Sequence, residues 1–223
     1  MQVSELTRLP EPELMDTPEQ VSAYAAADFS VPHQALVTKF AELFPDFGSG
    51  LVLDIGCGTA DVTARFALQY PEAQILGVDA GPEMLRVGVA HIASLGLSSR
   101  VTLHELHIPD ARLEELGPFD AFICNSLLHH LAEPSALWES LKYSASGAPV
   151  FVQDLRRPYN QQMLEAFVEI HTEGFAHELI TDFHNSLWAS YTAAEVREQL
   201  TSAGLTLTVE EIGDRHLIVY GRL

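Results

Sequence analysis

Two short apolar runs, each ending in an aspartate, constrain the fold of this chain more than any other feature. The first run, residues 51–53, ends in Asp54 and leads into a turn that contains Gly56 and Gly58. The second run ends in Asp79, twenty-five residues further on. A strand, a tight glycine turn, a helix-like segment and a second strand with an acid at its tip are typical of half of a nucleotide-binding α/β unit. The pattern therefore predicts a parallel sheet with a ligand at the carboxyl ends of its strands.

The acid before the glycine turn indicates a cationic ligand. The pyrophosphate of a dinucleotide is anionic and binds over such a turn at the positive end of the following helix, so Asp54 would repel it. The third glycine of the pattern G-x-G-x-x-G is also absent, because Asp61 holds that position. S-adenosylmethionine carries an ammonium and a sulfonium, which a carboxylate attracts. The turn therefore favours a methyl-donor site over a nicotinamide or flavin site.

A third segment, residues 118–131, extends this pattern with a fourth strand and a loop that contains His129 and His130. With the two acidic strand ends, it resembles the class I S-adenosylmethionine-dependent methyltransferase superfamily, in its small-molecule branch, over residues 48–155. The resemblance implies an α/β, Rossmann-like, doubly wound sheet of seven strands, mostly parallel and with the last antiparallel. It also implies S-adenosylmethionine as the methyl donor and S-adenosylhomocysteine as the product.

Length and hydrophobic pattern favour one domain. A chain of 223 residues, 47% of them hydrophobic, suits a single domain, 1–223, with a full core. We expect N-terminal cap helices over 1–45, a Rossmann-like core over 46–157 and 192–223, and a helical lid insert over 158–191. Residues 1–17 are expected to be irregular. Strands are predicted near 51–54, 74–79, 101–106, 119–125 and 149–155, with a closing hairpin over 205–221. Helices are predicted from 18 to near 30 and over 33–44, 61–69, 82–95, 135–143 and 192–203, with a weak turn near 110–116.

The charge of the chain argues against a nucleic-acid partner. The formal net charge is −19, from 12 basic and 31 acidic residues, whereas a nucleic-acid enzyme needs a basic footprint. Arg156 and Arg157 form the only adjacent basic pair. We expect no nucleic-acid and no membrane partner, and a monomer or homodimer. No apolar run reaches 18 residues and no secretory signal is recognisable. Cys57 and Cys124 suit no disulfide, which favours a cytoplasmic protein.

The resemblance assigns donor contacts residue by residue. It implies that Asp54 holds the ammonium and Asp79 the ribose hydroxyls, while the glycines let the backbone approach the donor. Family members commonly bind the adenine amino group with an acid after the third strand, where this chain has His107. Asp110 or the backbone of Ile108 are the alternatives. The predicted donor-binding residues are Tyr24, Asp54, Gly56, Cys57, Gly58, Asp79, Ala80, Met84, His107, Ile108, Asn125 and Ser126. For Met84, an ordinary core position is an equal alternative.

The chemistry of methyl transfer requires little beyond positioning and desolvation. A base is needed only if the acceptor atom carries a proton that must leave. His129 and His130 follow the fourth strand at the ligand-binding edge, and histidine suits that base role. A hydrogen bond to the loop backbone is the alternative role. The spacing of the lid histidines 171, 177 and 184 places only the last two on one face of a helix, and a break in that helix is expected near Thr181. No metal site is therefore predicted. The predicted substrate-pocket residues are Phe29, Arg156, Tyr159, His184 and Trp188, whose alternative role is the core of the lid.

These observations favour a methyltransferase that acts on a small organic acceptor by in-line displacement. One alternative is a protein or RNA methyltransferase, which would need a basic or extended groove. A second is a non-catalytic regulator that binds S-adenosylmethionine and transfers no methyl group. A nicotinamide oxidoreductase ranks last, because Asp54 and Asp61 oppose it.

Overall fold

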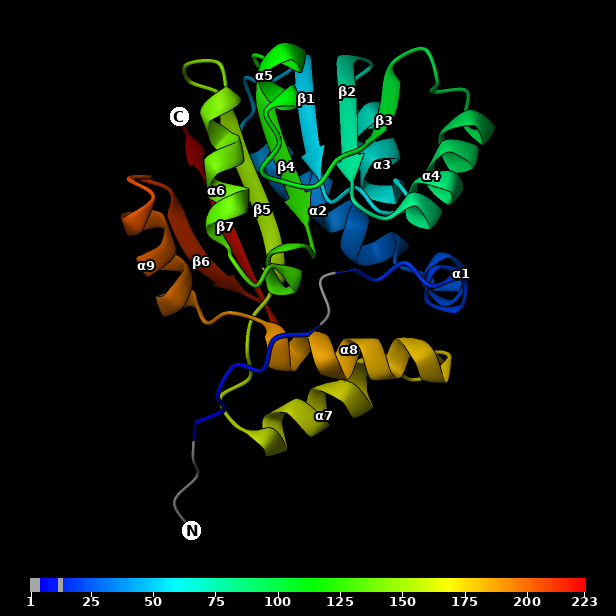
Figure 1. Ribbon diagram of the computed structural model, residues 1–223, viewed down its shortest axis with the longest axis vertical. Helices are drawn as coiled ribbons and strands as arrows, with labels where there is room; N and C mark the ends of the chain where they lie inside the picture. Colours follow the sequence, from blue (N-terminus) through cyan, green and yellow to red (C-terminus); the bar gives the residue numbers. More distant parts are fainter. Residues whose placement is uncertain (1–4, 12–13) are drawn as a thin grey trace.

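The structure is a computed structural model that describes residues 5–11 and 14–223; part of the expected irregular segment 1–17, residues 1–4 and 12–13, lies outside the described residues. Its centre is a seven-stranded sheet in the order β3-β2-β1-β4-β5-β7-β6 (Figure 1). Neighbours from β3 to β5 pair in parallel, and β7 pairs antiparallel with both β5 and β6. The predicted Rossmann-like sheet is thereby confirmed. The strands are β1 (Ser49–Ile55), β2 (Glu72–Asp79), β3 (Val101–Glu105), β4 (Ala121–Asn125), β5 (Pro149–Leu155), β6 (Thr208–Ile212) and β7 (His216–Arg222).

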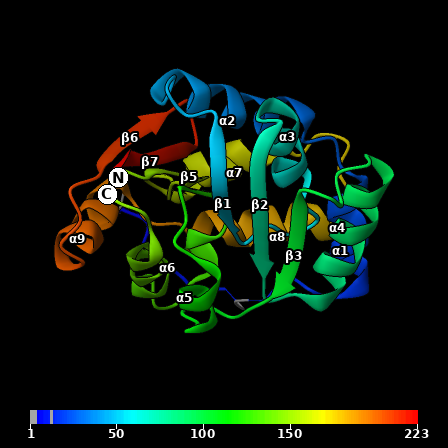
Figure 2. The same cartoon turned by 90° about the horizontal axis from the view of Figure 1, so that it is seen from above.

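Helices cover both faces of the sheet, as a buried parallel sheet requires. Figure 2 shows α2 and α3 over one face and α5 and α6 over the other. The helices are α1 (Pro18–Ala26), α2 (Ser30–Leu43), α3 (Asp61–Gln69), α4 (Pro82–Ser94), α5 (Arg112–Leu116), α6 (Ser135–Ser140), α7 (Gln161–His171), α8 (His177–Ala189) and α9 (Ala193–Ser202), with 3-10 turns η1 (Leu128–His130) and η2 (Leu141–Tyr143).

Helix ends agree with the sequence where capping residues mark them. Thr17 begins α1 and Thr192 begins α9, each in a complete capping box. The prediction that α2 begins after Pro32 is wrong, because proline fits the first helical turn, where its missing N–H has no partner to lose. Asp28 accepts a hydrogen bond from the Ser30 amide at 2.9 Å and supports this earlier start. The expected break near Thr181 is also wrong, since α8 is continuous.

The lid lies across the carboxyl ends of the parallel strands. Helices α7 and α8 cross that edge of the sheet (Figure 1) and share a small core with Leu6, Leu155, Leu164 and Leu187. Residues 5–11, which we call the N-terminal strap, run along the lid: the Leu6 amide donates to the Tyr159 carbonyl at 2.9 Å. The strap and the lid therefore close the ligand-binding edge together.

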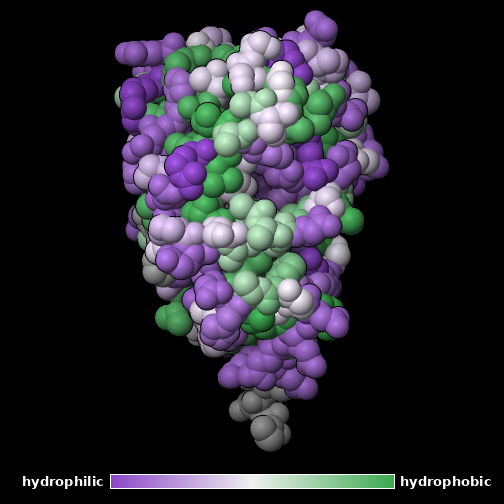
Figure 3. All heavy atoms as spheres, turned by 90° about the vertical axis from the view of Figure 1, so that its right-hand side faces the viewer, coloured by the Kyte–Doolittle hydropathy of each residue, from purple (hydrophilic) through white to green (hydrophobic). Residues whose placement is uncertain are grey.

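The surface combines hydrophilic cover with a local apolar patch. On the face in Figure 3, hydrophilic residues cover a large area, and hydrophobic ones gather at mid-height, at the level of α1 and α8. These two helices contact each other there. Among the described residues, no helix has both the length and the apolar character that crossing a membrane requires.

Candidate active site

A cavity of about 870 Å³ lies between the carboxyl edge of the sheet and the lid. Every predicted donor-binding residue, both predicted catalytic histidines and Phe29 line this cavity, although they come from distant parts of the sequence. Their contacts with a ligand stay predictions. The lining residues that the sequence predicted are Tyr24, Phe29, Asp54, Gly56, Cys57, Gly58, Asp79, Ala80, Met84, His107, Ile108, Asn125, Ser126, His129 and His130.

The glycine turn is held tightly against the end of β2. The amides of Gly56 and Cys57 both donate to the Val78 carbonyl, at 2.8 and 3.1 Å. Gly56 has a φ of +73°, and a Cβ there would lie 2.9 Å from the Cβ of Leu127. Only glycine satisfies both the backbone angle and the contact. The turn therefore keeps a bare stretch of backbone at the cavity wall.

Asp54 is a buried carboxyl that lines the cavity beside the glycine turn. Its side chain accepts a hydrogen bond from the Thr63 hydroxyl at 2.6 Å, and the residue is 2% exposed. Burial raises the pKa of Asp54 to about 7, the neighbouring Asp79 adds to the rise, and the Thr63 hydrogen bond opposes it. Burial therefore disfavours the ionised form of Asp54 in the free protein, and an ammonium beside it would favour that form.

We expect the affinity for S-adenosylmethionine to rise with pH through about 7 and to level off above it. Asp54 is neutral below its raised pKa and gains the charge that attracts the ammonium only as the pH passes that value. Isothermal titration calorimetry between pH 5.5 and 8.5 measures this. Asp54→Asn is the matched control: it should bind weakly throughout and lose the dependence. A flat profile for the unmodified protein would contradict the role of Asp54.

Asp79 sits at the tip of β2 between two backbone donors. Its two carboxylate oxygens accept hydrogen bonds from the amides of Gly58 and Gly81, each at 2.8 Å. Burial raises the pKa of Asp79, and these two bonds oppose the rise. A carboxylate has about four lone-pair sites, so both oxygens retain capacity for ribose hydroxyls. The position is compatible with the predicted ribose contact.

A buried histidine–aspartate pair lies where β4 leads into η1. The Nδ1 of His129 lies 2.5 Å from the Oδ1 of Asp154, on β5, and the Leu128 amide donates to Oδ2 at 2.6 Å. Burial alone would lower the pKa of His129, but the charge and hydrogen bond of Asp154 raise it above its ordinary value. In the same way, His129 holds the pKa of Asp154 low against the effect of burial. An ionised Asp154 only accepts, so Nδ1 is the donor and Nε2 is directed elsewhere.

The N-terminal strap supplies the groups around that histidine. Arg8 donates to the carbonyls of His129 and Leu131, at 3.2 and 3.1 Å. The Oε1 of Glu11 lies 3.7 Å from the Nε2 of His129 and 3.2 Å from the Nδ1 of His130. Sequence reasoning missed Arg8, Glu11 and Asp154. The sequence could have indicated Asp154, because it lies near the end of an apolar strand as Asp54 and Asp79 do. No comparable sequence pattern marks the strap residues.

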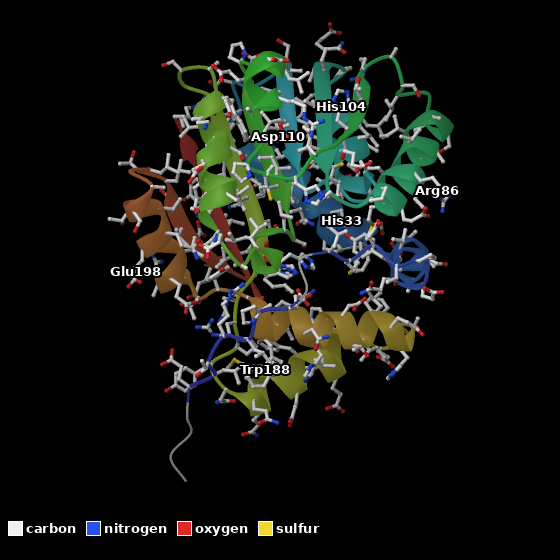
Figure 4. The ribbon with its side chains drawn as sticks, in the orientation of Figure 1. His33, Arg86, His104, Asp110, Trp188 and Glu198 are labelled. Atoms are coloured by element: carbon white, nitrogen blue, oxygen red, sulfur yellow. The ribbon has the colours of Figure 1, made fainter. Side chains whose placement is uncertain are left out.

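Four predicted substrate-pocket residues do not line the cavity, which corrects the prediction. Arg156 turns to the loop before β7, where it donates to the Asp214 carbonyl at 2.8 Å. Tyr159 is 55% exposed, and Trp188 packs against the lid core (Figure 4). His184 lies on another face of α8, because helical spacing brings a different set to the wall. That set consists of Leu179, Asp182, Phe183 and Ser186.

Two of the three groups predicted as alternatives for binding adenine line the cavity, and the third does not. Asp110 lies outside the cavity lining and pairs with Arg112 at 2.7 Å. His107 and Ile108 both line the cavity. The loop after β3 therefore offers the His107 ring or the Ile108 backbone, and not the carboxylate.

Comparison with known proteins agrees with this geometry. A family model described as a methyltransferase domain matches residues 52–143. A ubiquinone biosynthesis O-methyltransferase from Xylella fastidiosa is 30% identical over 114 residues, which are 51% of this chain and 45% of that protein. A second, from Xanthomonas campestris, is 32% identical over 113 residues, 48% of this chain and 43% of that protein. The chain thus spans about half the length of the curated relatives it matches.

Solved structures share the fold over nearly the whole chain. A methyltransferase from Aquifex aeolicus has a TM-score of 0.66 at 19% identity and covers 90% of this chain and 96% of its own. The plantazolicin methyltransferase BpumL, in complex with a monoazolic desmethylPZN analog and SAH, has a TM-score of 0.68 at 15% identity and covers 92% of this chain and 90% of its own. At these identities the likeness concerns the fold. Residues 52–143 therefore match a methyltransferase domain, and the chain has the fold of solved S-adenosylmethionine-dependent methyltransferases.

Proposed function

We propose that the protein transfers a methyl group from S-adenosylmethionine to a small organic acceptor. The observation that carries this proposal is that Asp54 and Asp79, beside the glycine turn, line the same cavity as His129 and His130. The acceptor's nucleophilic atom attacks the methyl carbon in line. The carbon–sulfur bond breaks, and its electron pair stays on sulfur, which gives S-adenosylhomocysteine.

A small acceptor fits the enclosure of the site better than a macromolecule. The strap and the lid cover the carboxyl edge of the sheet, and the cavity of about 870 Å³ must hold both the donor and the acceptor. The curated relatives named above carry O-methyltransferase in their names. We therefore favour a hydroxyl group as the methylated function and place it against His129 and His130, with Phe29 at the pocket wall.

The net charge and the cysteines of the chain bear on its partners and its cellular compartment. A net charge of −19 disfavours nucleic acid and anionic membrane as partners. Cys57 and Cys124 are both buried and unbonded, which suits a reducing compartment. We propose a cytoplasmic enzyme, monomeric or homodimeric, whose partner is its small-molecule acceptor.

Asp79→Ala should weaken S-adenosylmethionine binding by about 1–3 kcal/mol, or roughly 5- to 150-fold in Kd, because a buried charge-assisted hydrogen bond to the ribose is lost. Calorimetry on the folded variant measures it. Asp110→Ala, which removes a half-buried carboxyl outside the cavity lining, is the matched control and should keep its affinity. Unchanged affinity of the Asp79→Ala variant for S-adenosylmethionine would contradict the assignment of Asp79 to the ribose hydroxyls.

The function itself is tested with methyl-labelled S-adenosylmethionine, the purified protein and a size-fractionated lysate of the source organism. Label in the small-molecule fraction is the expected result and yields the acceptor for identification. Label in protein or RNA would replace the small acceptor with a macromolecular one. Donor binding without transfer to any fraction would indicate a regulator instead of an enzyme.

A further inference from the structure

Three side chains at the acceptor side of the cavity have the composition of a metal site. Glu11, His129 and His130 each offer one ligand atom, and these atoms lie within 4.8 Å of one another. The Glu11 Oε1 is 3.7 Å from one imidazole nitrogen and 3.2 Å from the other. In a tetrahedral zinc site, bonds of about 2.0–2.2 Å place neighbouring ligand atoms roughly 3.3–3.6 Å apart. The cluster is therefore close to coordinating distances before any metal enters.

The groups behind the cluster hold its atoms in place. Asp154 accepts from the Nδ1 of His129 at 2.5 Å, which leaves Nε2 to face Glu11. A carboxylate on the far nitrogen of a ligating histidine is the usual support of such a ligand, because it fixes the tautomer and raises its basicity. The Ser186 hydroxyl donates to the Glu11 carboxylate at 3.2 Å. Two of the three ligands thus have a hydrogen-bonded support of their own.

Burial and charge also fit a cation. The side chains of Glu11, His129 and His130 are 10%, 3% and 15% exposed, so a bound ion would be largely shielded from bulk water. The carboxylates of Asp154 and Asp182 act electrostatically on Glu11. Arg8 is a neighbouring cation, but its guanidinium donates to the carbonyls of His129 and Leu131.

We propose that Glu11, His129 and His130 bind one divalent transition metal ion, of the class that prefers two imidazoles and a carboxylate, such as Zn²⁺. Both histidines line the cavity, so the fourth position opens toward the acceptor. On the basis of the proposed function, the acceptor's hydroxyl oxygen takes that position. The metal withdraws electron density, the hydroxyl proton passes to water, and the oxygen then attacks the methyl carbon.

Co²⁺ serves as the probe, because its visible absorption reports on the ligands around it. The full chain, stripped with a chelator and dialysed, is titrated with Co²⁺ and, by calorimetry, with Zn²⁺. We expect one equivalent to bind with an absorption typical of four or five ligands. Glu11→Gln and His130→Ala should each weaken binding by more than tenfold, the loss that supporting groups alone produce. His184→Ala, a histidine of α8 outside the cavity lining, should leave it unchanged.

Several results would overturn the metal site. Absence of Co²⁺ and Zn²⁺ binding by the folded protein would do so, as would equal binding by Glu11→Gln and the unmodified chain. Methyl transfer at full rate by the metal-free protein would contradict a role of the metal in the reaction, and His129 would then act as the base. The donor titration on the same metal-free sample separates the two proposals, because Asp54 and Asp79 bind the donor without the cluster. Failure to bind S-adenosylmethionine would count against the proposed function and not against the metal.

Discussion

Replacing Phe40 by alanine should lower the free energy of unfolding by about 3–5 kcal/mol, the range for large buried aromatic side chains. Phe40 lies on α2 and is 0% exposed. Its ring centroid is 4.8 Å from that of Phe66 on α3 and 4.9 Å from that of Phe44. The ring centroid of Phe151, on β5, lies 6.3 Å from that of Phe40. The truncated side chain would leave a cavity between two helices and the sheet, which rigid aromatic neighbours fill poorly.

Urea unfolding followed by circular dichroism measures this loss. Val31→Ala is the matched control, because Val31 lies on the same helix and is 78% exposed; its effect should stay within about 0.5 kcal/mol. A similar, small loss for both variants would mean that α2 contributes little to the stability of the core. A reduced Tm with preserved donor affinity at low temperature would separate the stability of α2 from the chemistry of the cavity.

The core of the fold was predictable because its signals are local. The β1 and β2 strands are short apolar runs, and the acids at their tips mark where each strand meets the ligand edge. The bounds of α3, Asp61–Gln69, agree with the predicted range, since the glycine turn fixes its start and a period of 3.6 residues its apolar face. The place of the predicted donor-binding residues in the cavity lining was predictable for the same reason: many of them follow strand ends, and strand ends of a parallel sheet meet at one edge.

The acceptor side was not predictable in the same way. Glu11 contacts Ser186, which is 175 residues away in the chain, and no local sequence pattern predicts such a contact. The residues of the lid that reach the cavity were not predictable for another reason. Its helices were recognisable, but the rotation of α8 about its axis decides whether His184 or Phe183 reaches the cavity, and tertiary packing sets that rotation. Of the residues that composition alone proposed for the acceptor pocket, Arg156, Tyr159, His184 and Trp188 therefore lie outside the cavity lining.

Substituting alanine for His129 should reduce kcat for methyl transfer by about 10²–10⁴-fold, the usual contribution of a group that manages a proton in the transition state. The loss follows whether His129 takes the acceptor's proton itself or holds a metal that acidifies it, so this variant tests the site and not the metal. The donor lies against Asp54 and Asp79 in our assignment. The Kd for S-adenosylmethionine should therefore change little, and the defect should appear in kcat.

Single-turnover kinetics with saturating donor measure the chemical step, and calorimetry measures donor affinity on the same sample. Asp154→Asn is the companion variant, because it keeps the size of the side chain and removes the charge that orients His129 at 2.5 Å. As a positioning residue, Asp154 should lower kcat less than the loss of His129 does, and combining the two substitutions should cost little more than His129→Ala alone, since both act through one imidazole. If a folded His129→Ala variant keeps more than about a tenth of kcat, the result lies well outside the expected range. It would indicate that the acceptor's reactive atom lies nearer the residues of the lid than η1.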